Sequence, residues 1–175
     1  HLEAEFGWLP GNPHPLPVAA LISGAGSLMF FFMGSLSALM GFLSDRLGPR
    51  MVMALTTTLF GIGFVLISTI TAPWQLYLYY GLLCGIGMSA HDVVLLSTVA
   101  RWFTKYRGLM AGIVKTGAGI GQVLLPVAAA YLIAIYNWRD AALMIGIVLL
   151  IGMLVMSQLL RRDPRAYGQL PLGET

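Results

Sequence analysis

The chain has 175 residues, of which 58% are hydrophobic and only 10% are charged. A water-soluble domain carries about 25% charged residues because its surface must be hydrated, so this composition excludes an ordinary soluble domain. The net charge is small, at +3, and the single cysteine, Cys84, excludes an internal disulfide bond and the multi-cysteine zinc sites. The ten methionines are expected to fill the core, so we expect no metal and no cofactor.

In chain order, uncharged segments predict five membrane-spanning helices joined by short polar connections. About 20 apolar residues cross the hydrocarbon core, and a helix satisfies its own backbone hydrogen bonds there. The uncharged stretch 51–90 is too long for one helix, and Pro73 with Trp74 divides it. The predicted fold class is an all-α, polytopic transmembrane helix bundle over residues 17–162, with spans at about 17–43, 51–71, 75–100, 108–135 and 141–160. Residues 1–16 are predicted to be an extracytoplasmic polar segment, and residues 163–175 a cytoplasmic tail.

The basic residues predict the orientation of the bundle. With these spans, eight of the ten lysines and arginines fall on one side of the membrane: Arg46, Arg50, Arg101, Lys105, Arg107, Arg161, Arg162 and Arg165. Loops rich in lysine and arginine stay in the cytoplasm. The sequence therefore predicts a multi-pass protein of the cell membrane with its N-terminus outside and its C-terminus in the cytoplasm.

The loop between the first two spans carries a motif. Residues 41–50 read Gly-Phe-Leu-Ser-Asp-Arg-Leu-Gly-Pro-Arg, which resembles the signature loop of the major facilitator superfamily at Gly41, Asp45, Arg46, Gly48 and Arg50. A carboxylate at the C-terminal end of a helix is not favoured by the dipole of that helix, so Asp45 should pair with a basic residue or with another helix N-terminus. The resemblance implies a latch that closes the cytoplasmic side in one state. The alternative is a solvated loop that only sets the topology.

Other segments extend this resemblance over nearly the whole chain. Arg101-Trp102-Phe103 with Arg107-Gly108 resembles the loop after helix four in the branch of monocarboxylate and oxalate–formate carriers, and forms a cytoplasmic charge cluster. Asn137-Trp138-Arg139 resembles the turn between helices five and six, and Phe6-Gly7-Trp8 resembles the entry to helix two. The resemblance implies that the five spans are helices two to six of the N-terminal half, with the remaining transporter helices expected from a longer chain.

Ionisable residues within the spans are candidate functional groups because they are costly in a membrane. Asp92 lies nine residues before Arg101, about 13 Å from the cytoplasmic boundary, and Lys115 lies about 10 Å inside on the next helix. The similar depth predicts an Asp92–Lys115 ion pair that serves anion binding or proton coupling. Lys115 has the alternative of extending to the cytoplasmic surface. His91 has the alternative of a neutral core histidine bonded to a helix carbonyl.

The fourth span combines a polar position with many glycines. Gln122 follows Lys115 by seven residues on the same helix face, so it extends the candidate substrate or proton pathway. The pairs Gly108/Gly112 and Gly117/Gly121 predict close packing against another helix, as do Gly81/Gly85 on the third span and Ser23, Ser27, Gly34 and Gly41 on the first.

These features predict a secondary active transporter that moves a small solute by alternating access, as a symporter or antiporter, in the lipid bilayer. The resemblance suggests a small organic anion such as a monocarboxylate, with a coupled proton or an exchanged anion. The alternative is a membrane structural or interaction subunit that does not transport. An enzyme is not expected because the chain lacks the H-E-x-x-H and G-x-S-x-G motifs. Nucleic-acid binding is not expected because the basic residues are spread over three loops.

Overall fold

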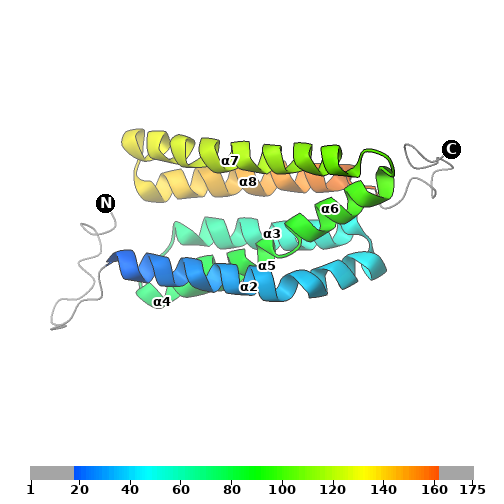
Figure 1. Ribbon diagram of the computed structural model, residues 1–175. Helices are drawn as coiled ribbons and strands as arrows, with labels where there is room; N and C mark the ends of the chain where they lie inside the picture. The colour runs from blue at the N-terminus through cyan, green and yellow to red at the C-terminus, as the bar shows by residue number, and fades with distance from the viewer. Residues whose placement is uncertain (1–17, 162–175) are drawn as a thin grey trace.

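The computed structural model describes residues 18–161, and within this range every regular element is a helix (Figure 1). The prediction of an all-α transmembrane bundle is confirmed. The helices are α2 (Val18–Leu47), α3 (Pro49–Ile67), α4 (Pro73–Leu76), the π-helix η1 (Tyr77–Cys84), α5 (Gly85–Met88), α6 (His91–Trp102), α7 (Arg107–Ile135) and α8 (Trp138–Leu159). Five stretches are long and apolar enough to cross a membrane, and α4 through α6 form one of them, Pro73–Trp102.

The helix boundaries follow from proline, glycine and one capping side chain. Gly48 adopts a φ of 91°, which side chains with a Cβ rarely tolerate, and its N–H bonds the Ser44 carbonyl as α2 ends. Pro49 then opens α3 at a position where its missing N–H costs nothing. At the other end of the bundle, Gln75 Oε1 accepts the backbone N–H groups of Thr71 and Ala72 at 2.6 and 3.0 Å. This cap fixes the start of the third span.

Helix α3 is at the centre of the described structure, where it packs against α8, α2, η1 and α5. Two glycines allow the closest approaches. A Cβ built on Gly61 would lie 2.5 Å from the Leu150 side chain of α8, and one on Gly87 would lie 2.6 Å from the Phe60 backbone nitrogen. Any larger residue at these points would push the helices apart. The innermost apolar cluster, Val52, Met53, Ala90 and Val94, lies between α3 and the third span.

The third span is not a uniform α-helix. Its first half contains the π-helical stretch η1, and two residues, Ser89 and Ala90, interrupt the helix before α6 begins at His91. Gly81 and Gly85 bring this half against α2, where Cβ atoms would lie 2.9 Å from the Leu28 side chain and from the Met29 carbonyl oxygen. The predicted packing through Gly81 and Gly85 is therefore confirmed.

Helix α7 is the peripheral helix of the described chain, with α6 and α8 as its main neighbours (Figure 1). None of its residues is buried. The predicted packing through Gly108/Gly112 and Gly117/Gly121 finds no partner helix within residues 18–161, since a Cβ at any of these glycines would meet no atom within 4 Å. The small-residue face exists, but no described helix lies against it. On α2, Gly41 closely approaches Val93, whereas Gly34 has open space.

Candidate functional site

Helix α6 carries two of the three ionisable residues that the sequence singled out within the spans, and it runs obliquely between the α2–α3 layer and the α7–α8 hairpin (Figure 1). His91 and Asp92 occupy its first turn, about 100° apart around the axis. The two side chains therefore take different directions. Asp92 reaches α7, and His91 turns toward α3 and α8.

The structure brings Asp92 and Lys115 together. The Lys115 Nζ atom donates a hydrogen bond to Asp92 Oδ1 at 2.7 Å, which joins α6 to α7. Lys115 thus points to the carboxylate rather than along its own helix to the end of α7 at Arg107. The side chains are 50% and 58% exposed, so residues 18–161 do not enclose either charge. Their role in transport stays a prediction.

Gln122 lies two turns beyond Lys115 on the same helix and is exposed. At 1.5 Å per residue it is about 10 Å from Lys115 along the axis. It therefore continues the polar face of α7 without joining the ion pair.

The signature loop contributes a second ion pair at the end of the bundle where α2 ends and α3 begins. Asp45, at the last turn of α2, forms a short salt bridge with Arg101, at the last turn of α6. The Asp45 side chain is 63% exposed and that of Arg101 is 30% exposed. The predicted basic partner of Asp45 is therefore a residue of the cytoplasmic charge cluster, 56 positions further along the chain. Gly41, one turn before Asp45 on α2, approaches Val93, about two turns before Arg101 on α6, which lets the two helices lie close together.

The other arginines of the two motifs have different partners. Arg46 places its guanidinium 4.4 Å from the centre of the Phe42 ring, and Arg50 Nε donates to Gln158 Oε1 at 2.7 Å. Arg107 Nε donates to the Phe103 carbonyl at 2.8 Å. The Arg46 and Arg107 contacts are local, within α2 and at the start of α7, whereas the Arg50 contact joins α3 to the end of α8. The Asp45–Arg101 ion pair joins α2 to α6.

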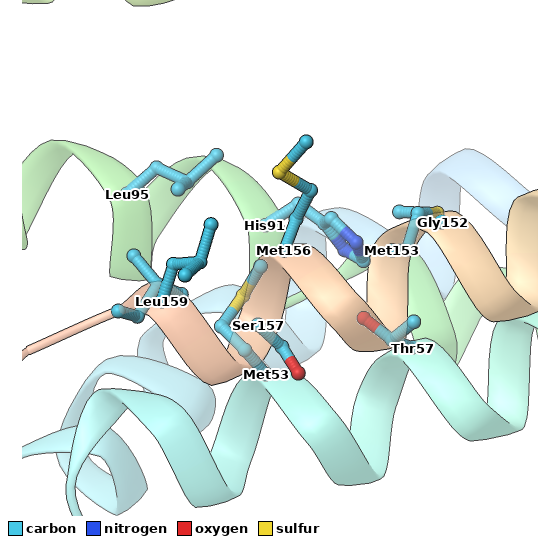
Figure 2. A pocket seen from close by; sticks show the side chains of 10 residues that line it. Met53, Thr57, His91, Leu95, Gly152, Met153, Met156, Ser157 and Leu159 are labelled. Atoms are coloured by element: carbon cyan, nitrogen blue, oxygen red, sulfur yellow. The ribbon is translucent and has the colours of Figure 1, made fainter.

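A cavity of about 410 Å³ lies between α3, α6 and α8 (Figure 2). Its walls are mostly apolar, with Met53, Met153 and Met156 among them, and its polar atoms come from His91, Thr57 and Ser157. Both ring nitrogens of His91 and the hydroxyl of Thr57 are buried and have no hydrogen-bond partner among the described residues. The carbonyls of Gly87 and Met88 lie near the imidazole, at positions that do not complete a hydrogen bond. Ser157 instead donates to the Leu154 carbonyl at 2.7 Å.

Sequence reasoning missed Thr57, Ser157 and the methionines of this cavity. Thr57 is one of three consecutive threonines in an apolar helix, and nothing in the sequence distinguishes it from Thr56, whose hydroxyl bonds the Val52 carbonyl at 2.8 Å. Only the packing of α8 against α3 shows which threonine faces the cavity. Within residues 18–161, no three histidine, cysteine or acidic side chains come together as metal ligands.

Comparison with known proteins agrees with a bundle of membrane-spanning helices. Residues 4–174 match the Major Facilitator Superfamily. The chain is 32% identical over 151 residues to the riboflavin transporter RibJ of Trypanosoma brucei brucei, which covers 85% of this chain and 28% of the relative. It is 34% identical over 135 residues to monocarboxylate transporter 11 of Homo sapiens, which covers 75% of this chain and 29% of the relative. It is 31% identical over 157 residues to the MFS transporter asaE of Aspergillus flavus, which covers 89% of this chain and 35% of the relative.

The chain thus spans about a third of the length of these curated relatives. They are all named as transporters, and the match extends over the signature loop, the α6–α7 loop and the five apolar spans. A helical bundle with these spans is a multi-pass membrane protein. The motifs of its loops and the overall sequence similarity indicate the same family. The chain belongs to the Major Facilitator Superfamily.

Proposed function

We propose that the chain is part of a secondary active transporter that moves a small organic anion, such as a monocarboxylate, by alternating access. The remaining helices of the transporter come from a longer protein. The Asp92–Lys115 ion pair carries this proposal, because two opposite charges on adjacent membrane spans, each about half exposed, are costly to keep there and are candidate functional groups. The similarity to monocarboxylate transporter 11 supports the substrate class.

The pair suggests how an anion and a proton are coupled. The Lys115 ammonium group can bind a substrate carboxylate, but it is already paired with the Asp92 carboxylate at 2.7 Å. A substrate that takes the ammonium group leaves Asp92 without its partner, and a proton that enters with the substrate balances the charge that the anion brings, which matters because unpaired charges are costly within a membrane. The substrate and one proton then cross together, without net charge. If Asp92 stays ionised, a second anion must replace the first, which gives exchange.

The Asp45–Arg101 pair acts in this proposal as the cytoplasmic latch. It joins the end of α2 to the end of α6, so the two helices separate at this side only when the pair breaks. We place this side in the cytoplasm and the N-terminus outside, since the described residues of the basic cluster, Arg46, Arg50, Arg101, Lys105, Arg107 and Arg161, all lie in or next to the connections at this end. The expected location is the cell membrane.

The test is uptake by vesicles that contain the full-length protein, measured with a panel of radiolabelled small carboxylates at several external pH values. We expect Lys115→Gln to abolish uptake, and Asp92→Asn to retain anion exchange while losing acceleration by an inward proton gradient. Asp140→Asn, at the far end of α8, is the matched control and should behave like the wild type. A double replacement of Asp92 and Lys115 that behaves no better than either single change would count against a functional pair. Vesicles that take up no solute would favour the non-transporting subunit.

A further inference from the structure

The end of the bundle where α2 meets α3 carries an excess of positive charge. The one carboxylate that residues 18–161 place there is Asp45, and it pairs with Arg101. The other cations of this end have contacts to neutral groups only: an aromatic ring for Arg46 and Lys105, an amide oxygen for Arg50, and a backbone carbonyl for Arg107. An anion is therefore attracted to this end.

Arg50 differs from the other three because its contact joins two membrane spans. Its Nε donates to Gln158 Oε1 at 2.7 Å, so the guanidinium bridges the start of α3 and the end of α8. The residue is exposed, and its other N–H groups donate to no residue of the described range 18–161. A guanidinium presents its donors in a planar fork that matches a phosphate group. Arg50 thus offers a phosphate a binding position at the edge of two spans.

Apolar side chains continue from Arg50 along both helices. Positions 51, 55 and 62 share one face of α3, and positions 147, 151 and 158 share one face of α8, because the spacing is i, i+4 and i+11 in each case. Gln158, the partner of Arg50, is therefore the last member of the α8 row. The apolar members are between 43% and 58% exposed, and they are Met51, Leu55 and Ile62 on α3 and Ile147 and Ile151 on α8.

These two rows lie on the side of the α3–α8 pair that faces away from the cavity of Figure 2. Met53 of α3 and Met156 of α8 line that cavity. Met53 is about 200° around α3 from Met51, and Met156 is about 140° around α8 from Ile151. The two helices pack directly against each other, so the rows form one surface, apolar along its length and cationic at the Arg50 end. We call it the α3–α8 surface.

We propose that the α3–α8 surface binds an anionic phospholipid, with its phosphate group on Arg50 and its acyl chains along the two apolar rows. A lipid uses both parts of this surface, whereas a soluble phosphate uses only the cationic end. The excess positive charge favours an anionic headgroup over a zwitterionic one, by about fivefold for each cation that it contacts. The proposal goes beyond transport and does not depend on which solute is carried.

Tryptophan fluorescence of the full-length protein tests this binding. Ile151→Trp places a fluorophore on the α3–α8 surface, and the protein with Ile151 gives the background from the native tryptophans. The vesicles contain equal parts of phosphatidylcholine and phosphatidylglycerol, and either one or the other carries brominated acyl chains, which quench tryptophan on contact. Brominated phosphatidylglycerol should occupy the position next to the new tryptophan with about fivefold preference. Equal quenching by the two lipids would overturn the proposal.

The contribution of Arg50 is tested in the same Ile151→Trp protein. Arg50→Gln should abolish the preference for phosphatidylglycerol, whereas Arg50→Lys keeps the charge and should keep the preference. Arg107→Gln is the matched control, because it removes the same charge at the same end of the bundle, but from the start of α7. A preference that survives Arg50→Gln, that is lost in Arg50→Lys, or that Arg107→Gln removes equally would contradict a site at Arg50.

A soluble anion is distinguished from a lipid by competition. An excess of glycerol phosphate should leave the quenching by brominated phosphatidylglycerol unchanged, because it has no acyl chains to lie along the apolar rows. If glycerol phosphate abolishes the preference, the position takes a free phosphate and the lipid proposal is wrong. None of these measurements involves uptake, so the lipid proposal and the transport proposal fail independently.

Discussion

The Asp92–Lys115 pair makes a quantitative prediction about stability. At 2.7 Å, two unit charges attract by about 1.5 kcal/mol at the dielectric constant of water and by about 6 kcal/mol at an effective value of 20. Because both side chains are about half exposed, screening keeps the coupling near the lower figure. We expect a coupling free energy of about 1–2 kcal/mol, above the range of about 0.2–1 kcal/mol for fully exposed pairs.

A double-mutant cycle with Asp92→Asn, Lys115→Gln and both together measures this coupling by thermal unfolding in lipid nanodiscs. Each single variant leaves one charge unpaired within the membrane and should be destabilised, while the double variant should recover most of the loss. About 1 kcal/mol corresponds to roughly 2–4 °C for a chain of this size. Asp140→Asn combined with Lys115→Gln is the control, and its effects should add, because Asp140 is in the first turn of α8 at the opposite end of the bundle. Additivity for Asp92 and Lys115 within about 0.5 kcal/mol would refute the coupling.

Three further predictions concern packing, the connection between α2 and α3, and the latch. Gly87→Ala should destabilise the protein by about 1–3 kcal/mol through overpacking against the Phe60 backbone, whereas Gly34→Ala, with nothing within 4 Å, should be neutral or stabilising; equal melting temperatures would contradict this. Gly48→Ala should cost about 1–2 kcal/mol, because its φ of 91° is unfavourable for alanine, and a denaturation midpoint like that of the wild type would show that the connection tolerates a Cβ. Asp45→Asn should slow uptake while changing stability by less than about 1 kcal/mol, and unchanged turnover in vesicle uptake would rule out the latch.

The sequence was sufficient to predict the architecture because hydrophobic length and loop charge determine which segments cross a membrane. Pro73 in the long uncharged stretch marked the start of the third span, where α4 begins. The contact between Asp92 and Lys115 was also predicted from the sequence, since similar depth on consecutive antiparallel helices brings the long lysine side chain within reach of the carboxylate. Gly48 and Pro49 marked the end of α2 and the start of α3.

Lateral contacts between helices were not predictable in the same way. A glycine pair shows that a helix can be approached closely, but not whether a helix is there: Gly81 and Gly85 contact α2, while the glycines of α7 face open space. The cavity between α3, α6 and α8 could not be predicted for a related reason. Helices α3 and α8 are far apart in the sequence, and only their packing in the fold turns Thr57 toward the cavity. The π-helical stretch Tyr77–Cys84 has no sequence signature that periodicity detects. The expected resemblance at Phe6-Gly7-Trp8 lies outside the described residues.

Helix α6 is held by an ion pair near each end, Asp92 to α7 and Arg101 to α2. The two anchors are nine positions apart on a helical segment about 14 Å long, and the turn at Ser89 and Ala90 separates that segment from the helix before it. A displacement of one anchor is therefore delivered to the other with little loss along the way. In the proposed mechanism, a solute at Lys115 and the latch at Asp45 thus act on the two ends of one rigid helix, α6, which would couple binding within the membrane to opening at its surface.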